Sequence, residues 1–134
     1  MNRKLARVHE IALEVRSWAE NEADKASRAE NLMGYCAIAS AELFKRLEKE
    51  GLAAEIHLSQ TDWGSHVYLV IEDHIVDVTA TQYHEFSATP VVIIHYKEAE
   101  QHEFYETSEI FWDVKALRKF QTNKRWPNDQ IAYR

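Results

Sequence analysis

The chain has 134 residues, of which 46% are hydrophobic and 28% are charged, a composition typical of a globular protein. Its net charge of −6 argues against non-specific binding to nucleic acid, and the one basic stretch, Lys124-Arg125-Trp126, is too short to change that expectation. No window approaches roughly 18 consecutive apolar residues, so no association with a membrane is expected.

The chain contains a single cysteine, which excludes an internal disulfide bond. Its first residues lack the apolar core of a signal peptide. Together these features predict a reducing, cytoplasmic setting, or delivery as an effector domain without a recognisable signal peptide. Glycine and proline are scarce and no repeat is present, so residues 1–134 are predicted to form one domain.

Helical periodicity dominates the first fifty residues. Apolar side chains recur at helical spacing over residues 3–20, and a shorter helical piece is expected over 22–29. After a break at Gly34, a second helix is predicted from 35 to 50, with Gly51 as its left-handed C-terminal cap.

The pattern then changes to the period of two that is typical of strands. The predicted strands are residues 54–58, 66–71, 75–78 and 91–96. The two middle strands form a hairpin, residues 60–65 form a loop, and the last strand is apolar enough to be central in the sheet.

A final helix is predicted from 108 to 120, with Ile110, Phe111, Val114 and Leu117 facing inward. The order of elements predicts an α+β fold, in which N-terminal helices are followed by a mostly antiparallel sheet and a C-terminal helix.

Cys36 stands at the start of the second predicted helix and on its apolar face. A helix N-terminus carries a partial positive charge and free N–H groups, which favour thiolate over thiol and can stabilise an oxyanion formed at a substrate carbonyl. A lone helical cysteine is more often a buried structural residue. Its position alone therefore does not identify a nucleophile.

His66 and Asp77 stand on the two strands of the predicted hairpin. Asp77 interrupts the apolar run Ile-Val-Asp-Val, where an acid is costly unless it is paired. A two-residue turn at Glu72-Asp73 places Asp77 opposite Tyr68 and diagonal to His66, within reach of its side chain. A three-residue turn sends Asp77 to the other face, where it is a solvent-facing acid. The hypothesis of a Cys-His-Asp triad therefore depends on this turn.

Three motifs resemble those of the papain-like/transglutaminase-like superfamily, most closely its small bacterial domains such as deamidating toxin domains and transglutaminase-like cysteine peptidases. They are residues 34–36 (Gly-Tyr-Cys), 64–68 (Gly-Ser-His-Val-Tyr) and 76–83 (Val-Asp-Val-Thr-Ala-Thr-Gln-Tyr). The likeness covers residues 31–84, and the third motif is the most specific. It implies a papain/transglutaminase-like fold, in which the nucleophile helix packs on the sheet.

The resemblance also implies that Cys36 is the nucleophile, His66 the base and Asp77 the orienting acid, with no cofactor or metal. An amide or thioester carbonyl in a protein or peptide is the implied substrate. Candidates for binding the oxyanion or substrate are Asn31, Trp63 and Gln82. Trp63 is equally compatible with simple packing, and Gln82 with holding the loop after the Asp77 strand.

Two other interpretations stay open. The chain is alternatively a non-catalytic papain-fold module that binds or inhibits a partner protein. A metal site made from Cys36, His57, His66 or His74 is the weakest interpretation, because no Cys-x-x-Cys or His-Glu-x-x-His spacing is present.

Overall fold

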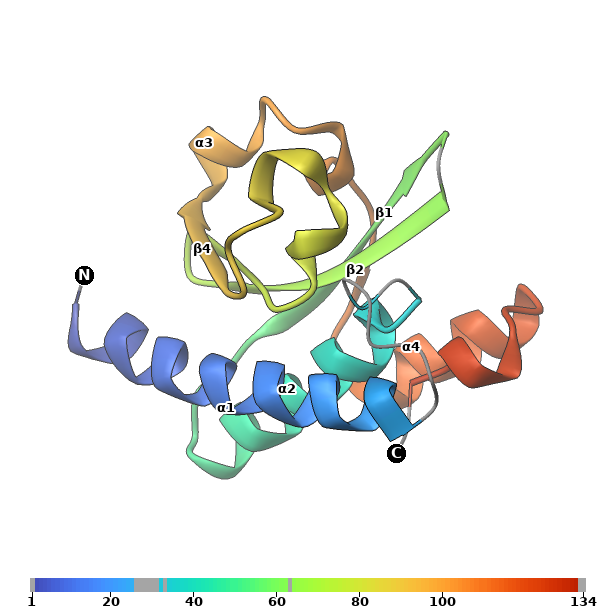
Figure 1. The fold of residues 1–134 in the computed structure, drawn as a ribbon, viewed down its shortest axis with the longest axis horizontal. Helices are drawn as coiled ribbons and strands as arrows, with labels where there is room; N and C mark the ends of the chain where they lie inside the picture. Colours follow the sequence, from blue (N-terminus) through green and yellow to red (C-terminus); the bar gives the residue numbers. More distant parts are fainter. Residues whose placement is uncertain (1, 26–31, 33, 63, 133–134) are drawn as a thin grey trace.

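A computed structural model describes residues 2–25, 32, 34–62 and 64–132, and this part of the chain forms an α+β fold (Figure 1). It contains four α-helices and a five-stranded antiparallel sheet. The helices are α1 (Arg3–Lys25), α2 (Cys36–Lys49), α3 (Tyr96–Ala99) and α4 (Val114–Asn123). The predicted α+β class is therefore confirmed.

The two N-terminal helices follow the predicted periodicity. In α1 the side chain of Asn2 accepts a hydrogen bond from the Leu5 N–H (2.8 Å), and the apolar stripe of the helix is buried. The helix is continuous to Lys25, so the predicted shorter piece is not separate up to that point, and residues 26–29 lie outside the described part. Helix α2 ends as expected, with Gly51 at φ +73°, a conformation that glycine adopts without a steric penalty.

The strand order in the sheet is β4-β3-β2-β1-β5. The strands are β1 (Glu55–Thr61), β2 (Gly64–Ile71), β3 (His74–Asp77), β4 (Val92–His95) and β5 (Thr107–Phe111). Ile71 pairs with His74, so the connection between β2 and β3 is the two-residue turn Glu72-Asp73. The predicted hairpin is therefore confirmed, and of the two turn lengths considered the structure has the two-residue turn.

Three predictions about the sheet were wrong. Residues 60–65 are not a loop throughout, because Gln60 and Thr61 end β1 and Gly64 and Ser65 begin β2 in a continuous antiparallel ladder. Strand β4 is at an edge of the sheet and not central. It is apolar because Ile93 and Ile94 pack against different hydrophobic clusters on the two sides of the sheet.

The third error concerns the predicted helix over 108–120. Its first part is β5, which pairs with β1, and α4 begins only at Val114. The Asp113 side chain caps this helix by accepting a hydrogen bond from the Ala116 N–H (2.8 Å). Ile110 is therefore an exposed strand residue and not part of an inward helical face.

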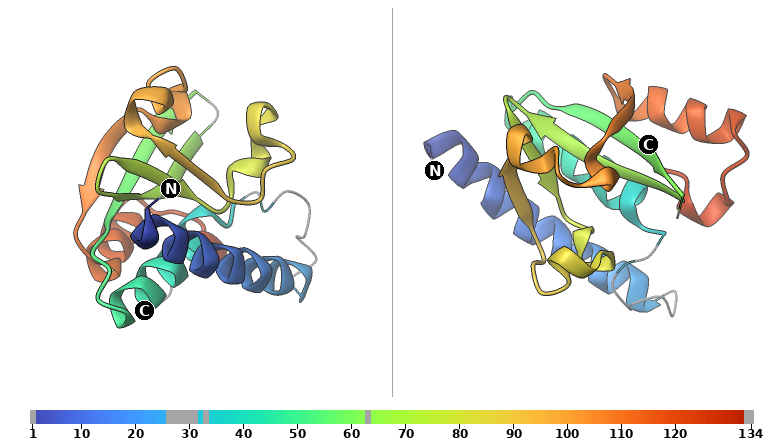
Figure 2. Two further views of the ribbon diagram at one scale, coloured as in Figure 1. Left: turned by 90° about the vertical axis from the view of Figure 1, so that its left-hand side faces the viewer. Right: turned by 90° about the horizontal axis from the view of Figure 1, so that it is seen from above.

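The sheet separates two layers (Figure 2). Helices α1, α2 and α4 cover one face and bury most of the hydrophobic core with it. The other face is covered by the segment between β3 and β5, which contributes Tyr83, Phe86, Phe104 and Tyr105 to a smaller aromatic cluster around Tyr68. Within the described residues, no helix combines the length and the apolar character that are needed to cross a membrane.

Candidate active site

The β2–β3 hairpin brings His66 and Asp77 together. Leu69 pairs with Val76, so Asp77 falls opposite Tyr68 and diagonal to His66, on the same face of the sheet. His66 Nε2 lies 2.6 Å from Asp77 Oδ2, and both side chains are fully buried. Because an ionised carboxylate only accepts hydrogen bonds, the Nε2–H of His66 is the donor in this contact.

Asp77 is held by partners on both of its carboxylate oxygens. Oδ1 accepts hydrogen bonds from the Thr79 N–H (2.9 Å) and the Thr79 hydroxyl (3.3 Å), and Oδ2 also accepts one from the Tyr105 hydroxyl (2.7 Å). Burial alone would raise the pKa of Asp77, but the charge of His66 and these hydrogen bonds outweigh burial and lower it. The carboxylate is therefore kept ionised in a dry site.

The pKa of His66 is set by the same pair. Burial disfavours its protonated form, but the charge of Asp77, the hydrogen bond to Asp77 and the interaction with Cys36 dominate and raise the pKa to about 10. The rings of Tyr68, Tyr83, Phe104 and Tyr105 surround the imidazole, with the edge-to-face contact to Tyr83 at 5.0 Å between ring centres. This aromatic enclosure keeps water from the imidazole and strengthens its pairing with Asp77.

Cys36 is the first residue of α2, and its side chain interacts with His66. Its side chain takes part in a hydrogen bond and a charge interaction with the imidazole. Since Nε2 is bound to Asp77, Nδ1 is the ring nitrogen that remains for the thiol. One turn later, the Ser40 hydroxyl donates to the Val67 carbonyl (3.1 Å), which fastens the start of α2 to β2 beside His66. The side chain of its N-cap residue, Tyr35, makes no capping hydrogen bond to this helix.

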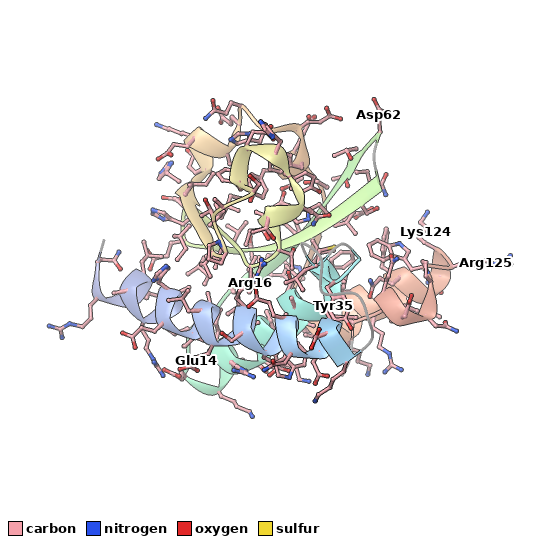
Figure 3. All side chains as sticks on the ribbon, viewed as in Figure 1. Glu14, Arg16, Tyr35, Asp62, Lys124 and Arg125 are labelled. Carbon is pink, nitrogen blue, oxygen red and sulfur yellow. The ribbon has the colours of Figure 1, made fainter. Side chains whose placement is uncertain are left out.

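The segment after Asp77 explains why the third sequence motif has its particular residues. Gln82 Nε2 donates to the Thr79 carbonyl (3.1 Å) and lies 3.3 Å from His66 Nδ1. Thr81 accepts a hydrogen bond from the buried Arg16 of α1 (2.9 Å), which also donates to the Val78 carbonyl (3.0 Å). In Figure 3, Arg16 lies on the sheet-facing side of α1. Helix α1 therefore supports the loop that carries Gln82.

A cleft of about 410 Å³ opens at Cys36. One part of its lining comes from Cys36, Gly64, Ser65 and Gln82, and another comes from the segment that follows α4. The described residues that line it are Gly34, Cys36, Gly64, Ser65, Gln82, Lys124, Arg125, Trp126, Pro127 and Gln130. A larger cavity of about 650 Å³ lies between α2 and α4, but Cys36, His66 and Asp77 do not line it. The cleft at Cys36 is therefore the space from which a molecule in solvent could reach the thiol.

The structure thus brings Cys36, His66, Asp77 and Gln82 together, whereas Asn31 and Trp63 lie outside the described residues. Gln82 both holds its loop and lines the cleft, so the two roles considered for it are compatible. Sequence reasoning missed Tyr105, Arg16 and the segment 124–130. An arginine on the apolar stripe of α1 was a usable signal, because a buried guanidinium needs acceptors. Nothing in the local sequence pointed to Tyr105.

The candidate metal ligands do not converge. His57, on β1, forms hydrogen bonds with Thr107 (2.9 Å) and Glu55 (3.0 Å). His74, on β3, packs edge-on against His95. In the part of the chain that the structure describes, no group of three or more His, Cys, Asp or Glu side chains is arranged to hold a metal ion.

Replacing Tyr105 by Phe is expected to lower the free energy of unfolding by about 1–3 kcal/mol, because a buried charge-assisted hydrogen bond to Asp77 is lost while the ring remains. The lowered pKa of Asp77 stabilises the fold above the ordinary pKa of the carboxyl, and this contribution disappears as the pH falls and Asp77 is protonated. The difference between wild type and Tyr105→Phe should therefore shrink at acidic pH in urea unfolding experiments. Tyr96→Phe, at a half-exposed ring, is the control, and an equal effect of both variants contradicts the prediction.

In comparisons with known proteins, no family model, no curated protein and no solved structure matched this chain. The geometry of the site therefore carries the functional argument without support from a relative.

Proposed function

We propose that the chain is a cysteine-dependent enzyme that acts on amide bonds through an acyl-thioester intermediate. Cys36 is the nucleophile, His66 the general acid and base, and Asp77 the residue that orients the imidazole. The α+β arrangement is here assigned to the papain/transglutaminase-like class, with α2 as the nucleophile helix, on the strength of the sequence motifs. No cofactor is required for this chemistry.

One observation carries the proposal. A fully buried His66 is bound to Asp77 through Nε2 (2.6 Å) and interacts with a cysteine at a helix N-terminus, at the wall of an open cleft. Burying a histidine and a carboxylate is costly unless the pair is well satisfied. A structural cysteine would not need such a partner. The arrangement matches what an activated thiol requires, namely a base within reach and an orienting group behind it.

The reaction begins from the Cys36 thiolate and the His66 imidazolium. The sulfur attacks the substrate carbonyl carbon, a C–S bond forms, and the carbonyl electrons move to oxygen, where the free N–H groups at the start of α2 face the negative charge. When this intermediate collapses, the C–N bond breaks and His66 donates its proton to the departing nitrogen. The products of this half-reaction are a free amine or ammonia and the acyl-thioester.

In the second half-reaction an acceptor attacks the thioester carbonyl and His66 takes its proton. The C–S bond breaks, and the thiolate–imidazolium pair is restored. If water is the acceptor, the outcome is peptide hydrolysis or glutamine deamidation; if an amine is the acceptor, the outcome is a new amide bond. We propose a protein or peptide as the substrate, because an open cleft admits a polypeptide side chain or segment.

Replacing Cys36 by Ala is expected to abolish the activity, with a loss of at least about 10³-fold, because no other group can form the thioester. Three readouts cover the possible acceptors: peptide cleavage by mass spectrometry, ammonia release from glutamine-containing proteins, and incorporation of a fluorescent amine. The intact mass of the wild-type protein should also show an acyl adduct that hydroxylamine removes. Since the chain has one cysteine, every thiol adduct reports on Cys36 alone.

The Cys36→Ala variant should remain folded, because the change removes one sulfur atom from a buried side chain, and circular dichroism checks this. If iodoacetamide alkylates native wild-type protein no faster than the urea-unfolded chain, Cys36 is not activated and the proposal fails. Binding of a partner protein that is unchanged in Cys36→Ala, without any of the three activities in wild type, would support the non-catalytic binding module instead.

A further inference from the structure

A basic stretch of this acidic chain lies at the mouth of the Cys36 cleft. Lys124 and Arg125 follow α4, and both line the cleft together with Trp126. Figure 3 shows the two labelled side chains projecting outward from this end of the molecule. No described acidic side chain lines the same cleft. Although the chain has a net charge of −6, the electrostatic field is therefore locally positive at the cleft that leads to Cys36.

The segment that carries these cations is held in place by its backbone. Arg125 adopts φ +58°, a left-handed conformation that ends the helix and turns the chain. The N–H groups of Arg125 and Trp126 bond to the carbonyls of Thr122 (3.1 Å) and Gln121 (3.0 Å). The buried Gln121 side chain then donates to the Gln130 carbonyl (3.1 Å) and accepts from the Ala132 N–H (2.8 Å). This wall of the cleft is therefore a fixed part of the fold.

The positive charges of Lys124 and Arg125 are not neutralised by an acidic side chain among the described residues. Arg7, Arg16 and Arg46 each pair with a glutamate. Neither Lys124 nor Arg125 forms an ion pair with any residue that the structure describes. Lys124 Nζ instead lies 5.8 Å from the centre of the Phe120 ring, which leaves its charge uncompensated.

We infer that the substrate is a polypeptide with acidic side chains beside the reacting amide, and that Lys124 and Arg125 select it. This inference rests on the proposed role of Cys36 as nucleophile. The triad itself cannot provide the selection, because the one positive charge of His66 is outweighed by the Asp77 carboxylate and the Cys36 thiolate, which leaves no positive charge for an acidic substrate. The remaining acidic surface repels an acidic segment, so the field of Lys124 and Arg125 both attracts it and sets where it binds. Trp126 adds an apolar surface on which the stems of glutamate side chains can pack.

The test uses three peptides with a thiol-reactive chloroacetyl group: chloroacetyl-Gly-Glu-Glu-amide, chloroacetyl-Gly-Gln-Gln-amide and chloroacetyl-Gly-Lys-Lys-amide. Their rates of reaction with Cys36 are followed by intact mass. For wild type at low salt we expect the order Glu, Gln, Lys, with the Glu peptide about 5- to 20-fold faster than its neutral isostere. In the double variant Lys124→Gln/Arg125→Gln this ratio should fall to about 1–2, and high salt should reduce it in wild type.

The matched control is Lys115→Gln/Lys119→Gln, which makes the same change in net charge at exposed positions of α4 outside the cleft. It should keep the wild-type preference. Equal rates for the Glu and Gln peptides in wild type, or a preference that survives in Lys124→Gln/Arg125→Gln, overturn the inference. Iodoacetamide, which is neutral, distinguishes the role of Cys36 from the preference for acidic substrates. If it reacts rapidly with every variant while the peptides show no charge preference, Cys36 is still the nucleophile and only the proposed substrate class is wrong. If it reacts no faster with the folded than with the unfolded protein, both are overturned.

Discussion

Replacing Asp77 by Ala is expected to lower the free energy of unfolding by about 3–5 kcal/mol, which is among the largest effects of any single substitution in this chain. The carboxylate accepts four hydrogen bonds, from His66, Tyr105 and the Thr79 N–H and hydroxyl. Without it these donors stay buried and unsatisfied, and a protonated His66 is left without its counter-charge. Urea unfolding at neutral pH measures the loss.

Asp77→Asn keeps the shape of the side chain and serves as the second variant if Asp77→Ala does not fold. The amide retains an acceptor but turns a donor towards groups that are themselves donors, so a smaller loss of about 1–3 kcal/mol is expected. Asp24→Ala, at an exposed position of α1, is the control and should stay within about 0.5 kcal/mol of wild type. A cost of Asp77→Ala no greater than that of Asp24→Ala would show that the pair with His66 does not stabilise the fold.

Replacing His66 by Ala is expected to slow the proposed acyl-transfer reaction of Cys36 by about 10²- to 10⁴-fold, the usual contribution of a general acid and base. Alkylation by iodoacetamide should also become slow at acidic pH, because the thiolate loses the imidazolium beside it. Rates measured across pH in wild type and His66→Ala test both effects. His84→Ala, at an exposed position, is the control and should react like wild type. Equal pH profiles for all three proteins would contradict the assignment of His66.

Because the pKa of His66 is raised, the free energy of unfolding should also depend on pH differently in wild type and in His66→Ala. A group whose pKa is higher in the folded state stabilises the fold most when it is protonated in both states. This contribution is therefore complete below pH 6.5 and is lost as the pH rises to about 10. The free energy of unfolding should fall across this window by up to about 1.4 kcal/mol for each pH unit in wild type, and this part of the decline should be missing in His66→Ala.

The pairing of His66 with Asp77 was partly predictable because it depends on local geometry. The period of two in a strand and the length of the turn decide which side chains share a face. The period can be inferred from neighbouring residues, whereas the sequence left a turn of two or of three residues open. The structure has the two-residue turn at Glu72-Asp73, and the two side chains meet. The role of each residue in the motif 76–83 was not predictable in the same way, because Arg16, which supports Thr81, comes from a distant helix.

The prediction of a helix over 108–120 was wrong because pairing with a strand far away in the sequence, and not local spacing, decides the structure there. Ile110, Phe111, Val114 and Leu117 have a spacing that a helix can bury, but the first two belong to a strand and the others to a helix. Pairing with β1 decides this, since Ile110 lies opposite His57 in the sheet. An Asp113 immediately before the helix was the local signal, as a typical N-cap residue.

The sequence by itself determined the two N-terminal helices, the hairpin within residues 66–78 and the α+β class, because each is encoded in periodicity, caps and turns over a few neighbouring positions. Only the tertiary structure decided the edge position of β4, the strand at 107–111, the hydrogen bond from Tyr105 to Asp77 and the placement of Lys124 and Arg125 at the cleft. These features join segments that are far apart in the chain. Their energy comes from contacts between such segments, and no short stretch of sequence records which distant partner it will bury.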